Sequence, residues 1–353
     1  MSGFIRNAWY VLAWSNELGR SLLSRRVLGE SIVAYRRQDG RPVALRDRCP
    51  HKLLPLSLGK LVGDELQCGY HGARFGEGGR CLHIPGQGRI PEAAHVQGYP
   101  LHERYDAVWI WMGDPALADP AGIVDIPQYG WPGWALIDGN YLHFASNYLN
   151  ISDNLVDPSH TSYVHPRTIG NAAGEGAPVT VVAADDRVTA YRWIENAPPV
   201  PVMQRYGRFA GLTDRWQYYW YVPPAVGGVD FGAIDAGTER TEANRDAGFR
   251  SFTYSFITPE TERTSHYFWL HLRNYALNDP DADAEVRRLY TLTFDEDREI
   301  LAAIQEQQNE AGTHEFVRFA IDGAAVKVRR MIARRLSEEA RAVAAATAEA
   351  RPA

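Results

Sequence analysis

Cysteine is scarce in this chain, which has 3 Cys among 353 residues. Three thiols cannot form a disulfide framework, so we expect them in the reducing cytoplasm, where thiols serve metals. Long apolar runs are also missing, because the longest, such as Ala107 to Met112, is far shorter than the ~20 residues of a membrane span. Arg6 and Asn7 interrupt the apolar start of the chain, which argues against a secretory signal.

Basic charge is not in excess. The chain has 37 Lys and Arg against 43 Asp and Glu, a net charge of -6. No positive footprint therefore predicts binding to nucleic acid or to an anionic membrane. A Gly-rich dinucleotide fingerprint after a strand is absent too, so we expect no nicotinamide site on this chain.

Aromatic residues and short strand-like segments are plentiful. The 10 Trp and 18 Tyr favour strands and apolar pockets over a helical bundle. The length suits two domains. Strands are expected at residues 26–35, 42–46 and 107–111, and the turn-rich stretch 113–120 predicts a seam between domains 1–118 and 119–353.

The second domain has a different pattern. A helical segment is expected from about residue 140 to 165, followed by strands at 179–182, 187–194, 215–222, 249–257 and 266–272. Helical spacing returns at 283–308 and at 324–348. Runs of strands with a few long helices predict an α+β fold, with an all-β domain before an antiparallel sheet wrapped by helices.

Two motifs in the first domain each pair a thiol with an imidazole. Cys49 and His51 form C-x-H, and Cys68 and His71 form C-x2-H. Such ligands suit tetrahedral zinc or a Rieske [2Fe–2S] cluster, in which Cys holds one iron and His the other. Zinc ribbons usually pair two Cys in one knuckle, so the even division here favours the cluster. We interpret Cys81 as a structural thiol.

Two further histidines, His160 and His165, lie five residues apart. Five residues rotate about 500° around a helix axis, so the two cannot share a face of a straight helix. Pro158 and Pro166 disfavour helical geometry at the residues before them, so the chain can bend and bring both imidazoles together. With one carboxylate they would form the facial triad of a non-haem Fe(II) site.

The missing carboxylate is expected on the later helix. Asp297 lies within an i, i+3, i+4 stripe of apolar residues that includes Phe294 and Leu301. A buried carboxylate without a partner is costly, so a metal is a reasonable partner. Asp295, next to charged residues, is expected to be solvated.

Together these motifs resemble those of the Rieske non-haem iron oxygenases, in the branch of vanillate O-demethylases, toluenesulfonate methyl-monooxygenases and dicamba O-demethylases. The resemblance covers nearly the whole chain. Besides the paired Cys/His motifs, it is carried by Asn154-x2-Asp157-x2-His160-x4-His165 and by residues 7–10, 109–115, 257–261 and 296–298. Two residues depart from those common in these relatives. Ala73 stands in place of Trp or Leu, and Pro158 stands in place of Leu or Phe.

The resemblance implies a site for each metal and a head-to-tail homotrimer. The cluster would be held by Cys49, His51, Cys68 and His71, and iron by His160, His165 and Asp297. Asp157 would bridge cluster ligand His71 of an adjacent subunit to a local iron ligand, and Asn154 would line the iron site.

The implied function is that of a terminal oxygenase. It would use O2, and electrons from NAD(P)H delivered by a separate reductase or ferredoxin, to hydroxylate an alkyl C–H of a small aromatic substrate. Carbon attached to oxygen or nitrogen would then leave as an aldehyde. A ring- or methyl-hydroxylating oxygenase acting on an aromatic acid or sulfonate is the alternative, and a simple iron–sulfur electron carrier is a third class, although carriers need only about a hundred residues.

The substrate pocket is expected among the aromatic residues of the second sheet. The candidates are Phe209, Trp216, Trp220, Phe231, Phe268 and Trp269. Asp230 and Asp235 are expected near this pocket, where no Arg is evident. Because a carboxylate would need a cationic partner, this favours a neutral amide, urea or ether as substrate.

Overall fold

The computed structural model describes residues 3–313 and 316–349. They form two compact units. The first comprises the described residues up to Ile123 together with Thr258–Glu262, and the second comprises Val124–Ile257 and the described residues from Arg263 onward. The expected boundary between residues 118 and 119 stays a prediction. No helix in the described ranges has an apolar stretch that could cross a bilayer.

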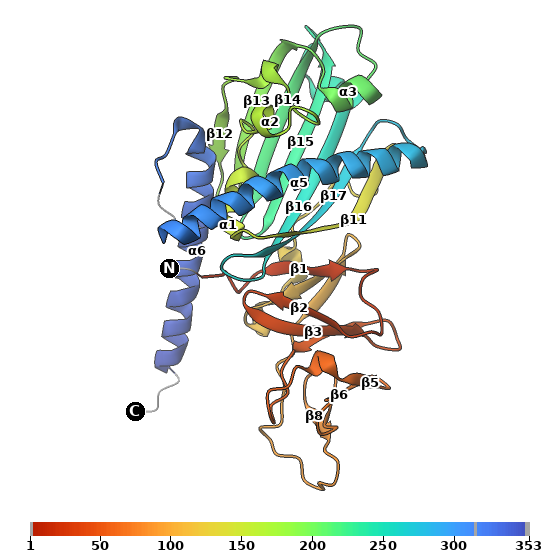
Figure 1. Ribbon diagram of the computed structural model, residues 1–353, viewed down its shortest axis with the longest axis vertical. Coiled ribbons are helices and arrows are strands. Elements are labelled where there is room, and N and C mark those ends of the chain that lie inside the picture. The colour runs from red at the N-terminus through yellow and green to blue at the C-terminus, as the bar shows by residue number, and fades with distance from the viewer. Residues whose placement is uncertain (1–2, 314–315, 350–353) are drawn as a thin grey trace. The chain divides into compact units, whose positions relative to one another are not determined.

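The first unit consists of three small antiparallel sheets (Figure 1). They are β1 (Trp9–Trp14) with β10 (Ala107–Trp111) and β9 (Leu101–Arg104); β2 (Leu23–Val27) with β3 (Glu30–Arg36) and β4 (Pro42–Arg46); and β5 (Lys60–Val62), β6 (Glu65–Gln67), β7 (Arg74–Phe75) and β8 (Cys81–His83). The single strand expected at 26–35 was wrong. Leu28 and Gly29 have φ of 49° and 81°, so a tight turn divides it into β2 and β3.

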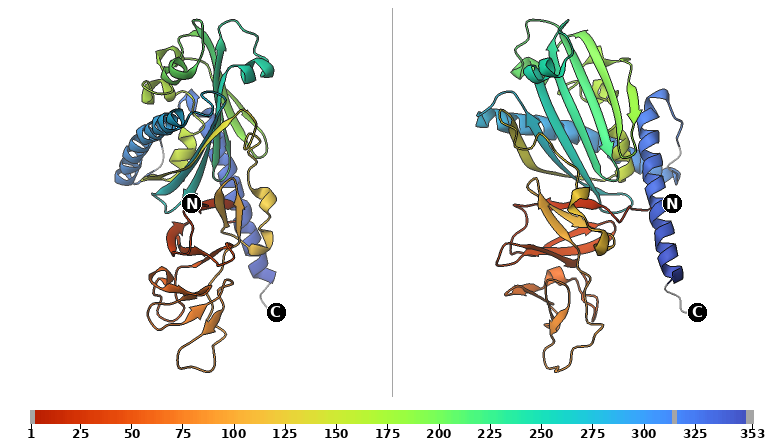
Figure 2. Two further views of the ribbon diagram at one scale, coloured as in Figure 1. Left: turned by 90° about the vertical axis from the view of Figure 1, so that its right-hand side faces the viewer. Right: turned by 180° about the vertical axis from the view of Figure 1, so that it is seen from behind.

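The second unit is built on one seven-stranded sheet (Figures 1 and 2). Its order is β11-β17-β16-β15-β14-β13-β12. The strands are β11 (Ala135–Phe144), β12 (Thr180–Ala183), β13 (Val188–Ala197), β14 (Thr213–Val222), β15 (Val226–Asp235), β16 (Phe249–Pro259) and β17 (Ser265–Arg273). Every residue of β16 and β17 is buried, so both faces of the sheet are covered there.

One long helix, α5 (Pro280–Ala311), crosses a face of this sheet (Figure 1). Asp279 caps its N-terminus by accepting hydrogen bonds from the N–H groups of residues 281 and 282, and Gly312 ends it at φ 66°. Between these ends, the buried Phe294 packs its ring 5.2 Å from the ring of Trp269 on β17. The 3.6-residue apolar stripe of the sequence thus seats α5 on the sheet.

The remaining helices are α1 (Tyr148–Asn154), α2 (Thr161–Val164), α3 (Pro201–Tyr206), α4 (Glu242–Ala247) and α6 (Gly323–Glu349). The continuous helical segment expected from about 140 to 165 was wrong. Its first residues belong to β11, which pairs with β17, and only then does Asn147 cap α1. The chain breaks again before α2. The α+β fold class itself is confirmed.

Candidate metal centres

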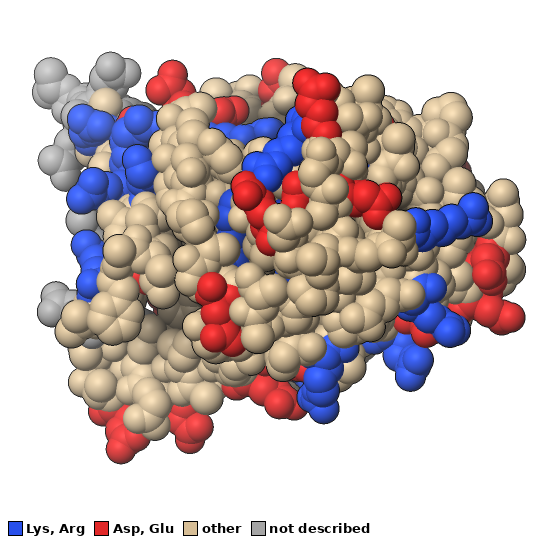
Figure 3. All heavy atoms as spheres, turned by 90° about the horizontal axis from the view of Figure 1, so that it is seen from above, with Lys and Arg blue, Asp and Glu red and all other residues tan. Residues whose placement is uncertain are grey.

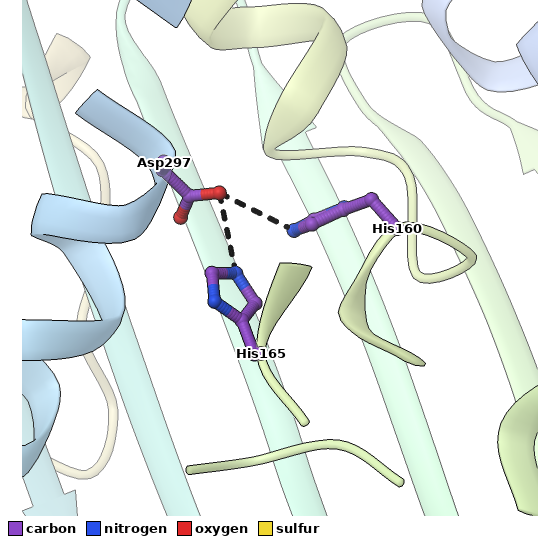
Figure 4. A group of neighbouring side chains, drawn as sticks. All are labelled: His160, His165 and Asp297. Carbon is purple, nitrogen blue, oxygen red and sulfur yellow. Dashed lines mark ion pairs between the residues drawn. The ribbon is translucent and has the colours of Figure 1, made fainter. Parts of the chain in front are cut away.

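Three side chains converge on the face of the sheet covered by α5 (Figure 4). Asp297 Oδ1 lies 3.2 Å from His165 Nε2 and 3.6 Å from His160 Nε2. One ligand atom of each residue lies within 4.8 Å of the others, and Asp297 and His165 are buried. Adjacent donors around an octahedral ion with bonds of about 2.1 Å are roughly 3 Å apart, so the three residues fit one metal ion.

The local chain path explains this convergence. Asp157 follows the end of α1, and its carboxylate accepts a hydrogen bond of 2.8 Å from Ser159 N, which turns the chain before His160. His165 ends the short α2. Gly170 then passes so close that a Cβ there would lie 2.0 Å from the Thr161 carbonyl oxygen, so only glycine fits. The predicted bend between the two histidines is present.

The second nitrogen of each imidazole is also held. His160 Nδ1 lies 2.5 Å from the backbone oxygen of Asp157, and His165 Nδ1 lies 2.9 Å from Glu296 Oε2. With Nδ1 donating in both rings, Nε2 is the free ligand atom. Metal-binding histidines almost always have such partners, which fix the tautomer. Glu296 had been noted only as part of a motif, and its role was missed.

Asn154 contacts the carboxylate ligand. Its side-chain nitrogen donates to Asp297 Oδ1 over 2.9 Å, so it orients the carboxylate as well as lining the site. Asp157 reaches the site through its backbone oxygen, whereas its carboxylate bonds with Ser159. This contact with His160 differs from a link through the Asp157 side chain.

The titration behaviour of the three residues follows from burial and from neighbouring charge. Burial lowers the pKa of His160 and keeps that ring neutral. Burial also acts to lower the pKa of His165, but Asp297 and Glu296 outweigh it and raise the pKa. Although burial alone would raise the pKa of Asp297, the two histidines hold it below its usual value. The neutral imidazole of His160 and the ionised carboxylate of Asp297 are the forms that bind metal.

A small cavity adjoins the three residues. Apart from the triad, its described lining residues carry no formal charge; they are Asn154, Leu155, Ile169, Tyr219, Val229, Phe231, Thr253, Ser255, Tyr290, Thr293 and Phe294. An apolar cavity with a few hydroxyl groups beside a metal site suits a small organic ligand.

Most of the aromatic residues expected to line a pocket lie elsewhere. Phe231 does line the cavity. Trp216 on β14 and Phe268 on β17 lie between residues whose side chains point to the cavity side of the sheet. Because side chains alternate along a strand, Trp216 and Phe268 point to the opposite face. The same holds for Trp220 on β14, whereas Trp269 packs under α5 and Phe209 precedes β14. The sequence could not identify the cavity face because both faces of this sheet carry aromatic residues.

The acidic residues expected near the pocket were also misplaced. Asp230 lies on the face of β15 opposite Phe231, where Trp216 donates to its Oδ1 over 2.8 Å. Arg250 Nη2 lies 2.7 Å from Asp230 Oδ2, and Arg245 binds the same oxygen. Asp230 therefore lies away from the cavity and is paired with two arginines on the opposite face of the sheet.

In the first unit, the two Cys/His loops have matching backbone geometry. Cys49 N donates to the oxygen of the residue five positions on, and Leu53 N donates back to Cys49 O. Cys68 makes the corresponding bonds with Ala73 and Gly72. The fifth residue of each loop, Leu53 or Gly72, has a positive φ, 62° and 74°. Leu53 adopts this left-handed conformation at a cost of about 1 kcal/mol.

The cysteines of these loops are buried, whereas the histidines are exposed. Cys49 and Cys68 are buried and close enough for their thiols to interact. His51 and His71 are exposed, and their ring centroids lie 4.6 Å apart. Burial raises the pKa of the Cys49 thiol, and Cys68 raises it further. Thiols inside and imidazoles outside suit a cluster whose two irons have different ligands. Cys81 is buried in the core of these loops, as expected for a structural thiol.

Comparison with known proteins agrees with both centres. Residues 8–100 match the Rieske [2Fe-2S] domain family, and residues 144–338 match the vanillate O-demethylase oxygenase C-terminal domain family. The chain is 38% identical to the iron–sulfur subunit of a toluene-4-sulfonate monooxygenase system from Comamonas testosteroni, over 95% of this chain and 98% of that protein. It is 36% identical to the oxygenase component of dicamba O-demethylase from Stenotrophomonas maltophilia, over 93% and 97%.

A solved structure shows the same fold. The crystal structure of dicamba monooxygenase bound to 3,6-dichlorosalicylic acid superposes with a TM-score of 0.87 at 33% identity, over 96% of this chain and 99% of that one. Another crystal structure of dicamba monooxygenase contains non-haem iron and dicamba. The chain belongs to the Rieske non-haem iron oxygenases, in the branch of the vanillate and dicamba O-demethylase oxygenase components.

Proposed function

We propose that this protein is the terminal oxygenase of a monooxygenase system that removes an alkyl group from oxygen or nitrogen of a small aromatic substrate. The overall change is R–O–CH3 + O2 + 2 electrons + 2 protons, giving R–OH, formaldehyde and water. The observation that carries this proposal is the His160, His165 and Asp297 triad beside a cavity lined by uncharged residues.

We assign iron to the triad and a [2Fe–2S] cluster to Cys49, His51, Cys68 and His71. When bound, the ferrous ion supplies oxygen activation and the cluster supplies electrons. Within the chain, Glu296 and the Asp157 carbonyl orient the two imidazoles, and Asn154 orients Asp297. The apolar residues of the cavity exclude water from the substrate carbon.

Electron delivery requires other chains in this proposal. A reductase or ferredoxin carries electrons from NAD(P)H, because the relatives are oxygenase components of multi-protein systems. Exposed His51 and His71 offer the cluster edge to a partner. We assign a homotrimer, in which Asp157 receives His71 of a second copy and passes electrons through its own carbonyl to His160.

Relatives support dealkylation. Two are named for O-demethylation of dicamba and vanillate, and a third, 34% identical, is the oxygenase component of a chloroacetanilide N-alkylformylase. The test is turnover by the purified chain with a matched reductase on methoxyaryl acids, N-alkyl amides and ureas. Release of aldehyde in a 1:1 ratio to dealkylated product is expected. Absence of aldehyde, together with a retained hydroxyl group, would contradict dealkylation.

Hydroxylation of a methyl group without dealkylation is the second candidate. The toluene-4-sulfonate monooxygenase subunit favours it, because its identity to this chain, 38%, is higher than that of the demethylases quoted above. Both candidates use the same triad and cavity. Product analysis with toluene-4-sulfonate distinguishes them, since hydroxylation of its methyl group gives an alcohol and no aldehyde fragment.

A further inference from the structure

One hydroxyl group beside the triad has no hydrogen-bond partner in the described part of the chain. It belongs to Tyr219 on β14, which is 4% exposed and lines the same cavity as His160, His165 and Asp297. Tyr219 Oη forms no hydrogen bond with any residue that the structure describes. Buried hydroxyl groups are normally hydrogen-bonded, and leaving one unpaired is costly, so this group calls for an explanation.

The Tyr219 hydroxyl is buried but not fully enclosed. Among the described residues, the polar side-chain atoms that are fully enclosed without a partner include His271 Nε2 and Arg215 Nε, but not Tyr219 Oη. This oxygen therefore keeps contact with space that a small group can enter. Because Tyr219 is buried and lines the cavity, that space is the cavity.

Every other uncharged polar side chain among the described lining residues already has a partner. The pairs are Thr253 with His271, Ser255 with Tyr267, Thr293 with the Leu289 carbonyl, Tyr290 with Ser251, and Asn154 with Asp297. Tyr219 alone keeps its whole hydrogen-bonding capacity for a bound molecule. The cavity offers a ligand no charge besides the triad, in contrast to the face in Figure 3, which carries Lys, Arg, Asp and Glu side chains.

The strand register places Tyr219 on the side of the sheet where the histidine ligands lie. Gln217, two residues earlier on the same face of β14, donates from Nε2 to Thr161 Oγ1 over 3.3 Å, and Thr161 directly follows His160. On the next strand, Val229 is the register partner of Tyr219 and also lines the cavity.

The hydroxyl of Tyr219 is thus a hydrogen-bond donor close to the metal ligands. Burial raises the pKa of Tyr219, the charge of Arg192 opposes this rise, and the charge of Asp297 adds to it, so the oxygen keeps its proton at neutral pH. A carbon that reacts at the triad must lie against the triad, and the atom bonded to that carbon is one bond farther away. In a small cavity, a donor from the wall meets that atom.

We propose that Tyr219 donates a hydrogen bond to the ether oxygen of an alkyl aryl ether, and that this contact selects such ethers as substrates. The proposal rests on the function proposed above and narrows its substrate class. An ether oxygen has lone pairs that accept a hydrogen bond. The nitrogen of an anilide shares its lone pair with the carbonyl group, and the methyl carbon of an alkylarene has none. A buried donor discriminates against molecules that leave it unpaired, so Tyr219 is a specificity-determining residue.

The test is binding without turnover, so it does not depend on catalysis. Calorimetric titration of the oxidised, iron-loaded protein would compare a panel of methoxyarenes with their ethyl isosteres, such as 4-methoxybenzamide with 4-ethylbenzamide, in which CH2 replaces the ether oxygen. Tyr219→Phe removes the hydroxyl and keeps the ring. Tyr191→Phe is the matched control, because Tyr191 pairs with Tyr218 and so lies on the face of the sheet opposite Tyr219.

We expect at least one ether to bind the wild type about 5-fold more tightly than its ethyl isostere, which is the effect of one neutral hydrogen bond. Tyr219→Phe should abolish this preference by weakening the binding of the ether, while the isostere binds equally well or more tightly. Tyr191→Phe should keep the preference. Without ligand, Tyr219→Phe should melt at the wild-type temperature or above, because it removes a buried hydroxyl that has no partner.

Four results would overturn the assignment. They are the absence of any ether that binds more tightly than its isostere, a preference that survives in Tyr219→Phe, an equal loss of binding for ethers and isosteres, and a lower melting temperature in Tyr219→Phe than in Tyr191→Phe. The last two would make the hydroxyl structural. Failure of the proposed function would look different, since ethers would then bind with the preference that depends on Tyr219 but would release no aldehyde when the reductase is supplied.

Discussion

Glu296 provides the sharpest test of how the second metal site is built. Its Oε2 lies 2.9 Å from His165 Nδ1, its side chain is 13% exposed, and the side chain of His165 is 1% exposed. A hydrogen bond to a charged group in such a place contributes about 1.5–3 kcal/mol. Removing it should therefore weaken metal binding on the order of 10- to 100-fold, which is the usual effect of losing a partner of this kind.

Two substitutions separate the charge from the hydrogen bond. Glu296→Gln keeps an oxygen acceptor and should lower Fe(II) affinity about 10-fold, whereas Glu296→Ala loses both and should lower it about 100-fold. Glu299→Gln, an exposed glutamate one turn further along α5, is the control. The assay is Fe(II) titration against a competing chelator under anaerobic conditions, with visible absorbance reporting the cluster.

Glu296 would have no role in holding His165 for metal if Glu296→Ala bound Fe(II) as tightly as the wild type while remaining folded. Equal losses in the Gln and Ala variants would show that the charge alone matters. A loss of cluster absorbance would show that the substitution acts beyond the triad, because Glu296 belongs to the second unit and the Cys/His loops to the first.

Three further substitutions test other parts of the account. His160→Ala should lower iron from three atoms to two per chain and abolish turnover while the red-brown cluster persists; retained activity would contradict its assignment as a ligand. Asp157→Asn should slow reduction of the iron site in single-turnover experiments with both metals bound, and an unchanged rate would exclude the bridge. His271 is fully buried, and burial lowers its pKa to about 3, whereas in the unfolded chain it takes up a proton near pH 6.5. The unfolding free energy should therefore decrease as pH falls below about 6.5. His271→Asn should remove about 2 kcal/mol of the loss in unfolding free energy between pH 7 and 5, measured by urea denaturation; the exposed His83→Asn is the control, and an unaltered pH dependence would contradict the prediction.

The sequence by itself determined the chemistry that each segment offers. C-x-H and C-x2-H motifs indicate a cluster with different irons because ligand type and spacing are local properties. The prolines beside His160 and His165 predicted a bend, since proline restricts the residue before it. Asp297 was found because a helix repeats every 3.6 residues and so reveals a carboxylate within an apolar stripe.

Only the tertiary structure decided which groups meet. Alternation along a strand separates its side chains into two faces but does not say which face lies toward the metal. Because both faces of β14 and β15 are buried here, the sequence pattern does not distinguish Trp216 from Phe231. Glu296 acquired its role because α5 places it against His165, 131 residues away in sequence. Arg192 and Arg215 are at most 3% exposed and have no carboxylate within 4.0 Å among the described residues, which a sequence cannot reveal because pairing of charges depends on distances in the folded chain.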